Sequence, residues 1–157
     1  MHYTCPVMKL LRAQWPWHGA GSDCPLGSTM STTSENQVQN PILSAVLQEG
    51  VLRIHPVGPN VSQHEAPIID QDVKPLLTKA GEDLRALVLD LHDVTFMSSM
   101  GLGTCIALRN AANATGARTA IIGLNSELES LFKMMRIHKL YDVQKDEAAL
   151  TKWLSKI

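Results

Sequence analysis

The sequence has few cysteines and aromatic residues, and it has no long hydrophobic run. Its three cysteines, Cys5, Cys24 and Cys105, form neither a CxxC pair nor a metal-ligand spacing, so they predict no zinc site and no disulfide framework. No apolar stretch approaches the roughly 20 residues that a membrane-spanning helix needs. The 14 basic and 15 acidic residues nearly cancel, and no basic run exceeds two residues, which argues against direct nucleic-acid binding.

Several catalytic and cofactor-binding motifs are also missing. The sequence contains no GxxxxGK[ST] loop and no GxSxG elbow, and the GLG at 101–103 lacks the third glycine of a dinucleotide fingerprint. His92, Asp93 and Ser99 do not suggest a hydrolase, because adjacent residues in strands and turns point apart. We therefore expect a binding protein without enzymatic activity, cofactor or metal, and keep a small nucleotide-binding α/β protein as an alternative.

The composition predicts one globular domain after an unusual N-terminal segment. Apolar residues make up 45% of the 157, enough for a sizeable core. Residues 1–40 have no sustained hydrophobic period and become polar toward their end, which is typical of a tail. We interpret 1–40 as a disordered or misannotated extension with the true start at Met30, and 41–157 as the domain. Alternatively, the extension is genuine and docks on a partner through Trp15 and Trp17.

Hydrophobic periodicity within 41–157 alternates between the strand and helix types. Strands are expected at 45–48, 51–57, 87–91, 118–123 and 140–143, and helices at 69–80, 102–114, 126–135 and 147–154. This order predicts an α/β fold, with a mostly parallel or mixed central sheet of about four to five strands and about four covering helices.

Some local features carry predictions of their own. Pro75 should kink or shorten its helix because proline lacks an N–H group. Ser126 and Glu129 match a capping box, in which Ser126 is the cap that opens the next helix. Met134 and Met135 continue the apolar spacing of that helix, so we expect them in the core, with a docking stripe as the alternative. Cys105 is expected to be buried in its helix.

Residues 86–103, ALVLDLHDVTFMSSMGLG, form the most informative segment. A buried strand leads through a short turn to Ser98 and Ser99, just before the helix expected at 102–114. The free N–H groups and positive dipole end of a helix start favour a phosphate on a serine there. Equally, the serines can simply cap the helix. Asp90 and Asp93 lie where sites gather in α/β sheets, although they can also be ordinary surface carboxylates of a turn.

The same segment carries a family resemblance. Asp90-Leu91-x-Asp93-Val94-x-Phe96, followed by Ser99 and then Gly101-Leu102-Gly103, resembles the signature of STAS domains, and more narrowly that of bacterial anti-sigma factor antagonists. In those proteins a serine just before the helix is phosphorylated by the partner, an anti-sigma factor with kinase activity. Ser99 matches that serine. Ser98 stands where the family has aspartate, and Met100 where it has a small residue.

The resemblance implies a STAS fold and a cytoplasmic protein that works by partner switching with an anti-sigma factor of the serine kinase type. It implies phosphorylation at Ser99 rather than Ser98. The partner-binding surface that it implies comprises Asp93, Ser98, Ser99, Met100, Gly101, Leu102 and Gly103. The alternative within the family is a STAS scaffold or transporter-associated subunit that is not phosphorylated.

Overall fold

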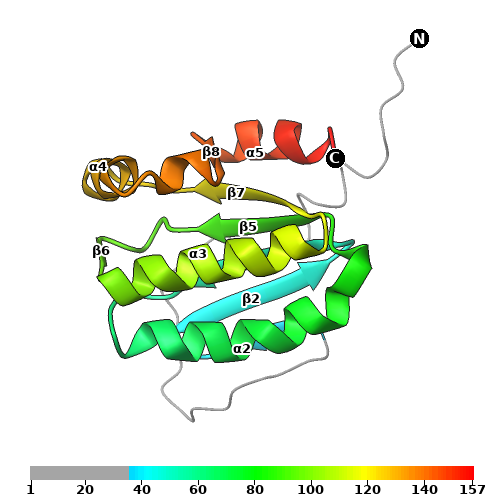
Figure 1. Ribbon diagram of the computed structural model, residues 1–157, viewed down its shortest axis with the longest axis horizontal. Coiled ribbons are helices and arrows are strands. Elements are labelled where there is room, and N and C mark those ends of the chain that lie inside the picture. The colour runs from blue at the N-terminus through cyan, green and yellow to red at the C-terminus, as the bar shows by residue number, and fades with distance from the viewer. Residues whose placement is uncertain (1–35) are drawn as a thin grey trace, which may run out of the picture.

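The computed structural model describes residues 36–157. Most of the predicted extension, including Met30, Trp15 and Trp17, lies outside the described residues. The described part forms a six-stranded sheet in the order β1-β2-β3-β5-β7-β8, with helices around it (Figure 1). The strands of this sheet are β1 (Gln37–Gln39), β2 (Leu43–Gln48), β3 (Val51–Pro56), β5 (Ala86–Asp90), β7 (Arg118–Ile122) and β8 (Asp142–Gln144). The helices are α2 (Glu65–Ala80), α3 (Ser99–Ala114), α4 (Ser126–Met134) and α5 (Glu147–Leu154), with short 3-10 helices η1 (Gly81–Asp83) and η2 (Ile137–Lys139).

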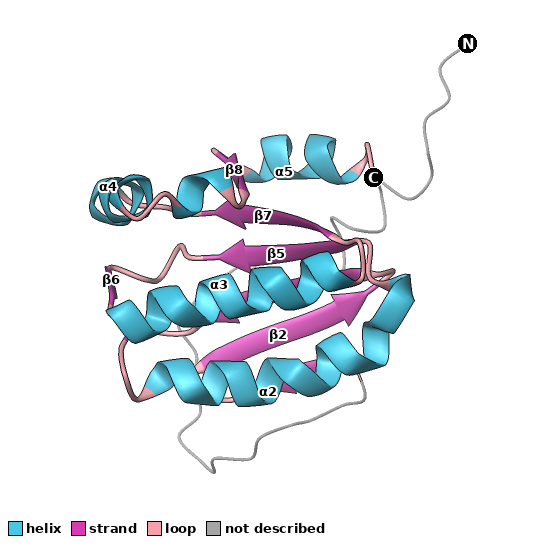
Figure 2. Cartoon of the chain, in the orientation of Figure 1, coloured by secondary structure: helices cyan, strands magenta, loops and turns pink. Residues whose placement is uncertain are grey.

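The predicted α/β class and mixed sheet are confirmed. β1, β2 and β3 pair antiparallel, whereas β3, β5, β7 and β8 pair parallel and are connected through helices (Figure 2). The β2–β3 turn has positive φ at Glu49 (51°) and Gly50 (75°), as a two-residue hairpin turn requires. The sheet has more strands than predicted because β1 pairs with β2. The sequence of β1, QVQ, has no hydrophobic pattern that could have predicted a strand. The sheet therefore begins before residue 41.

Apolar side chains cover both faces of the central strands. On one face, Leu87 and Leu89 of β5 belong to the main core with residues of α2, α3 and α4. On the other face, Ala86 and Val88 pack with Leu150 and Trp153 of α5. β5 is buried throughout, which explains its continuous apolar sequence.

Two local predictions are wrong, the Ser126 cap and the burial of Met134 and Met135, and the predicted shortening of a helix at Pro75 does not occur. α2 is not shortened at Pro75 but continues to Ala80, and Pro75 is exposed, so the carbonyl it leaves without an N–H partner can face water. α4 is capped by Asn125 rather than Ser126: its side chain accepts a hydrogen bond from Leu128 N at 2.8 Å. Met134 and Met135 are 76% and 53% exposed.

Met134 lies in the last turn of α4, off the helix face that buries Leu128 and Phe132, and Met135 lies just past the end of the helix. Arg136 then adopts a left-handed backbone conformation, and the helical period that would have turned Met135 inward stops. Other local predictions hold: Cys105 is buried, and the Asp146 side chain caps α5. No helix among residues 36–157 combines the length and apolarity that crossing a membrane requires.

Candidate functional site

A second, two-stranded sheet holds the segment that precedes α3. β4 (Asn60–Val61) follows β3 and pairs in parallel with β6 (Phe96–Met97), which follows β5. Ser98 continues this pairing by donating its backbone N–H to Val61 O at 3.0 Å. The loops after two neighbouring strands therefore fix the start of α3 together. The sequence did not reveal this pair because two-residue strands have no measurable period.

The two serines have different structural positions. α3 begins at Ser99, earlier than the predicted start at 102, and Ser98 is its N-cap. The Ser98 Oγ accepts a hydrogen bond from Gly101 N at 3.2 Å, and Ser98 O accepts one from Leu102 N at 3.0 Å. Aspartate and serine are comparable N-caps, so Ser98 supplies the same cap as the residue it replaces in the family pattern.

Ser99 occupies the first helical position and is exposed. Within the described part of the chain its hydroxyl forms no hydrogen bond, and the N–H groups of Ser99 and Met100 have no acceptor. These groups belong to the set of N–H groups that every helix start leaves unpaired, at the positive end of the helix dipole. An anionic group on Ser99 would therefore lie beside free donors.

The predicted binding residues divide into surface and core. Ser99, Met100, Asp93 and Gly103 are exposed, whereas Gly101 and Leu102 are buried. A Cβ at Gly101 would lie 2.6 Å from the Val61 carbonyl oxygen, so this glycine allows the helix to approach β4. The sequence prediction missed Phe96, whose side chain is 57% exposed just before the serines, beside Met100 at 48%. The sequence feature that could have indicated this exposure is an aromatic residue between the buried strand and the helix, where no apolar period continues.

Asp90 is a buried carboxylate, so the alternative of an ordinary surface carboxylate is wrong for it. It is 3% exposed at the end of β5, and its Oδ2 accepts a hydrogen bond from Arg53 Nε of β3 at 3.1 Å. Arg53 also forms an ion pair with Glu147 in the first turn of α5. The Asp90 Oδ1 lies 2.6 Å from His92 Nδ1. This cluster joins two strands, the turn after β5, and α5.

His55 connects this cluster to the turn that carries Asp93. Its Nε2 lies 3.0 Å from Asp93 Oδ2, and its Nδ1 lies 3.7 Å from Asp90 Oδ1. Arg53 and His55 alternate with Leu52 and Ile54 along β3, so these polar groups share the face on which α5 packs. This alternation of polar and apolar residues is visible in the sequence, but by itself it predicts only a strand of the hairpin and not a cluster of charges.

The pKa values follow from burial and pairing. Burial favours the neutral form of Asp90, but hydrogen bonds and charge from His55, Arg53 and His92 outweigh it and hold the pKa of Asp90 far below its usual range. Burial also favours the neutral form of His55, which lowers its pKa. The hydrogen bonds and charges of Asp90 and Asp93 outweigh burial, so the pKa of His55 is raised. We name Arg53, His55, Asp90, His92, Asp93 and Glu147 the charge cluster.

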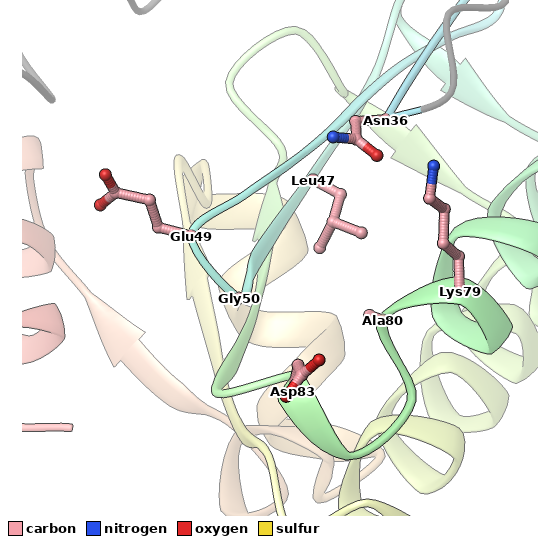
Figure 3. Close-up of a pocket in the computed structure, with 7 residues that line it drawn as sticks. All are labelled: Asn36, Leu47, Glu49, Gly50, Lys79, Ala80 and Asp83. Carbon is pink, nitrogen blue, oxygen red and sulfur yellow. The ribbon is translucent and has the colours of Figure 1, made fainter.

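A hollow of about 220 Å³ lies at the other end of the strands. It is lined by Asn36, Leu47, Glu49, Gly50, Lys79, Ala80 and Asp83 (Figure 3). Gly50 directly precedes β3, whereas Asp93 and Ser99 follow the far end of β5, so this hollow is not part of the site. It is also smaller than typical ligand pockets of roughly 300–1,000 Å³. No group of three or more potential metal ligands occurs within residues 36–157.

Comparisons with known proteins agree with the predicted fold. The family model described as the STAS domain matches residues 24–150. SpoIIAA of Bacillus in its phosphorylated form is 13% identical with a TM-score of 0.56, over 70% of this chain and 97% of that chain. An anti-sigma factor antagonist from Mycobacterium paratuberculosis is 19% identical with a TM-score of 0.59, over 70% of this chain and 91% of that chain.

A transporter is also similar. The murine anion transporter Slc26a9 is 15% identical with a TM-score of 0.61, over 70% of this chain and 18% of the transporter. At these identities the likeness to each solved structure establishes a shared fold.

Proposed function

The chain belongs to the STAS domain family, and from this premise we propose that it is an anti-sigma factor antagonist controlled by phosphorylation of Ser99. In the unphosphorylated state its surface around Asp93, Phe96, Ser99 and Met100 binds an anti-sigma factor of the serine kinase type. The partner phosphorylates Ser99 and the complex separates. The protein acts by binding and not by catalysis, in the cytoplasm where sigma factors act.

The observation that carries this proposal is the exposed Ser99 hydroxyl at the first position of a 16-residue helix. A kinase can reach the hydroxyl without unfolding the helix, because the capping function belongs to Ser98. The product phosphate gains the free N–H groups of the helix start. The two departures from the family pattern are compatible with this role, since Ser98 caps the helix and Ser99 stays exposed beside Met100.

The switch follows from charge in an apolar setting. Phe96 and Met100 are 57% and 48% exposed, and a partner that covers them removes water from the Ser99 region. Phosphorylation adds about −1.5 to −2 charges there. A charge buried without a counter-charge from the partner costs several kcal/mol, which is enough to dissociate a typical transient complex.

The test combines phosphate mapping with binding titrations. The full chain is incubated with ATP and the serine-kinase anti-sigma factors of its host, and phosphopeptides are mapped by mass spectrometry. We expect phosphate on Ser99 and none on Ser98. Ser99→Asp should weaken binding at least about tenfold, or ~1.4 kcal/mol. Ser99→Ala should bind like the wild type and resist phosphorylation, and Ser98→Asp, which restores the family residue and keeps a good cap, should retain both properties. Phosphate on Ser98, or normal binding by Ser99→Asp, contradicts the proposal.

A second candidate is a STAS scaffold or transporter-associated subunit that binds constitutively. The likeness to Slc26a9 and the serine at position 98 in place of the family aspartate favour it. It predicts no phosphate on Ser99 after incubation with any of these kinases. The hollow near Gly50 does not support the nucleotide-binding alternative, because it is small and the sequence has no phosphate loop.

A further inference from the structure

The end of α4 exposes two adjacent methionines between buried residues. Met134 and Met135 are 76% and 53% exposed, whereas Phe132 and Ile137 on either side are buried. Met134 is the most exposed of the large hydrophobic side chains in the described part of the chain. Single exposed apolar residues are common, but here two consecutive large apolar side chains lie in solvent at the end of one helix.

Basic residues surround these methionines. Lys133, Arg136 and Lys139 are exposed, and the sequence has no acidic residue between Glu129 and Asp142. Lys133 pairs with Glu129 at 2.6 Å. Arg136 and Lys139 form no ion pair within residues 36–157. We name Lys133, Met134, Met135, Arg136 and Lys139 the methionine patch.

Arg136 has a backbone conformation that arginine does not favour. Its φ is 59°, in the left-handed region, at the position that follows the end of α4. Glycine is the usual residue at such a helix end, and another residue there costs about 1 kcal/mol. The backbone does not favour an arginine at this position, and its charge has no partner in the described structure. The position therefore carries a cation at some expense of stability.

We propose that the methionine patch binds a partner protein through an acidic segment that carries apolar side chains. Flexible methionine side chains adapt to an apolar surface, and the surrounding cations attract carboxylates and select against basic segments. An anionic membrane is a poorer fit, because three cations supply only about 1 kcal/mol each and two methionines insert little apolar area. Asn125, at the start of α4, donates a hydrogen bond to Val94 O, so α4 is anchored beside the turn that leads to Ser99. The patch lies at the opposite end of α4 and offers a second contact outside the proposed switch.

The test uses a random peptide library displayed on phage and selected against the full chain. Enriched peptides are synthesised with a fluorescent label and titrated by anisotropy at low and high salt. We expect acidic peptides with apolar residues, and affinities that fall as salt rises. Arg136→Gly and Met135→Ser should each weaken binding at least about fivefold. Arg136→Gly is especially informative because glycine suits the backbone, so its melting temperature should be unchanged or higher.

Matched controls separate this surface from others. Lys152→Gln removes an exposed cation of α5 and should leave peptide affinity unchanged, and so should Ser99→Asp. The peptide titrations therefore test the methionine patch even if Ser99 is not phosphorylated. The inference is overturned if no acidic peptide is enriched or if affinity is insensitive to Arg136→Gly and Met135→Ser. Loss of binding in Ser99→Asp, or binding to phosphatidylserine vesicles but not to peptides, also overturns it.

Discussion

Asp90→Asn should destabilise the protein severely although it changes almost no volume. Asp90 is 3% exposed, and its ion-pair partner Arg53 has a side chain that is 6% exposed. The amide keeps the shape and part of the hydrogen bonding but removes the negative charge. Arg53 then stays buried near a neutral group, and His55 loses one of the charges that raise its pKa. The predicted effect is therefore electrostatic rather than a packing defect.

The magnitude follows from the burial of the pair. Breaking a buried ion pair by removing one charge costs about 3–5 kcal/mol. Glu147 still pairs with Arg53 from the first turn of α5, so we expect the lower end, about 3 kcal/mol. For a chain of this size that corresponds to a fall in melting temperature of about 6–12 °C. The matched control is Glu147→Gln: the Glu147 side chain is 48% exposed, and its loss should cost at most about 1 kcal/mol.

The cost should also depend on pH. The lowered pKa of Asp90 stabilises the fold above the ordinary carboxyl value of 3.8, and this contribution is lost as the pH falls below it. The raised pKa of His55 stabilises the fold fully below its ordinary value of 6.5, and this contribution is lost as the pH rises through the folded-state pKa. The difference between wild type and Asp90→Asn should therefore be largest between these two values and shrink on both sides.

Urea denaturation followed by circular dichroism at several pH values measures this difference. A cost of Asp90→Asn below about 1 kcal/mol would refute the reasoning, because it would mean that Asp90 carries little of the pairing. A cost independent of pH would refute it as well. The same variant should loosen the turn that carries Asp93 through His55, and we expect weaker binding of the anti-sigma factor at temperatures where the variant remains folded.

Three further predictions separate packing from surface function. Ser98→Ala should cost about 1 kcal/mol in urea denaturation as a lost helix cap, whereas Ser99→Ala should cost almost nothing; equal costs would contradict the assignment of the cap. Leu89→Ala, in the middle of β5, should cost about 2–5 kcal/mol in the same assay, and a smaller value would show that the strand is not central. Gly101→Ala should destabilise by about 1–3 kcal/mol because its Cβ meets a backbone oxygen at 2.6 Å, whereas Gly103→Ala in open space should be neutral or slightly stabilising by calorimetry.

The sequence determined most of the regular elements. The spacing of Ile69, Val73 and Leu76 placed the apolar face of α2, and all three residues are buried. The continuous apolar run of β5 identified a central strand. These predictions succeed because the apolar residues on one face of a helix or strand recur in the sequence at the period of that element. Burying this apolar face stabilises the element.

The sequence also placed two serines at the start of α3, but it did not show which one caps the helix and which one is exposed. Which serine caps the helix depends on the backbone at Ser98, and that backbone is fixed by pairing with Val61 from a distant loop. The pair β4–β6 is too short for any pattern to predict it. The difference between a capping and an exposed serine is therefore a consequence of tertiary structure.

The tertiary structure alone decided the surroundings of Asp90 and the methionines. Arg53 pairs in register with Val88, two residues before Asp90 on the same face, so the parallel alignment of β3 and β5 brings the two charges together. Met135 has the right spacing for the core but follows the last residue of α4, where the backbone turns at Arg136. Periodicity describes which residues share a face of one element, whereas burial and pairing depend on which other elements meet that face and on where the element stops.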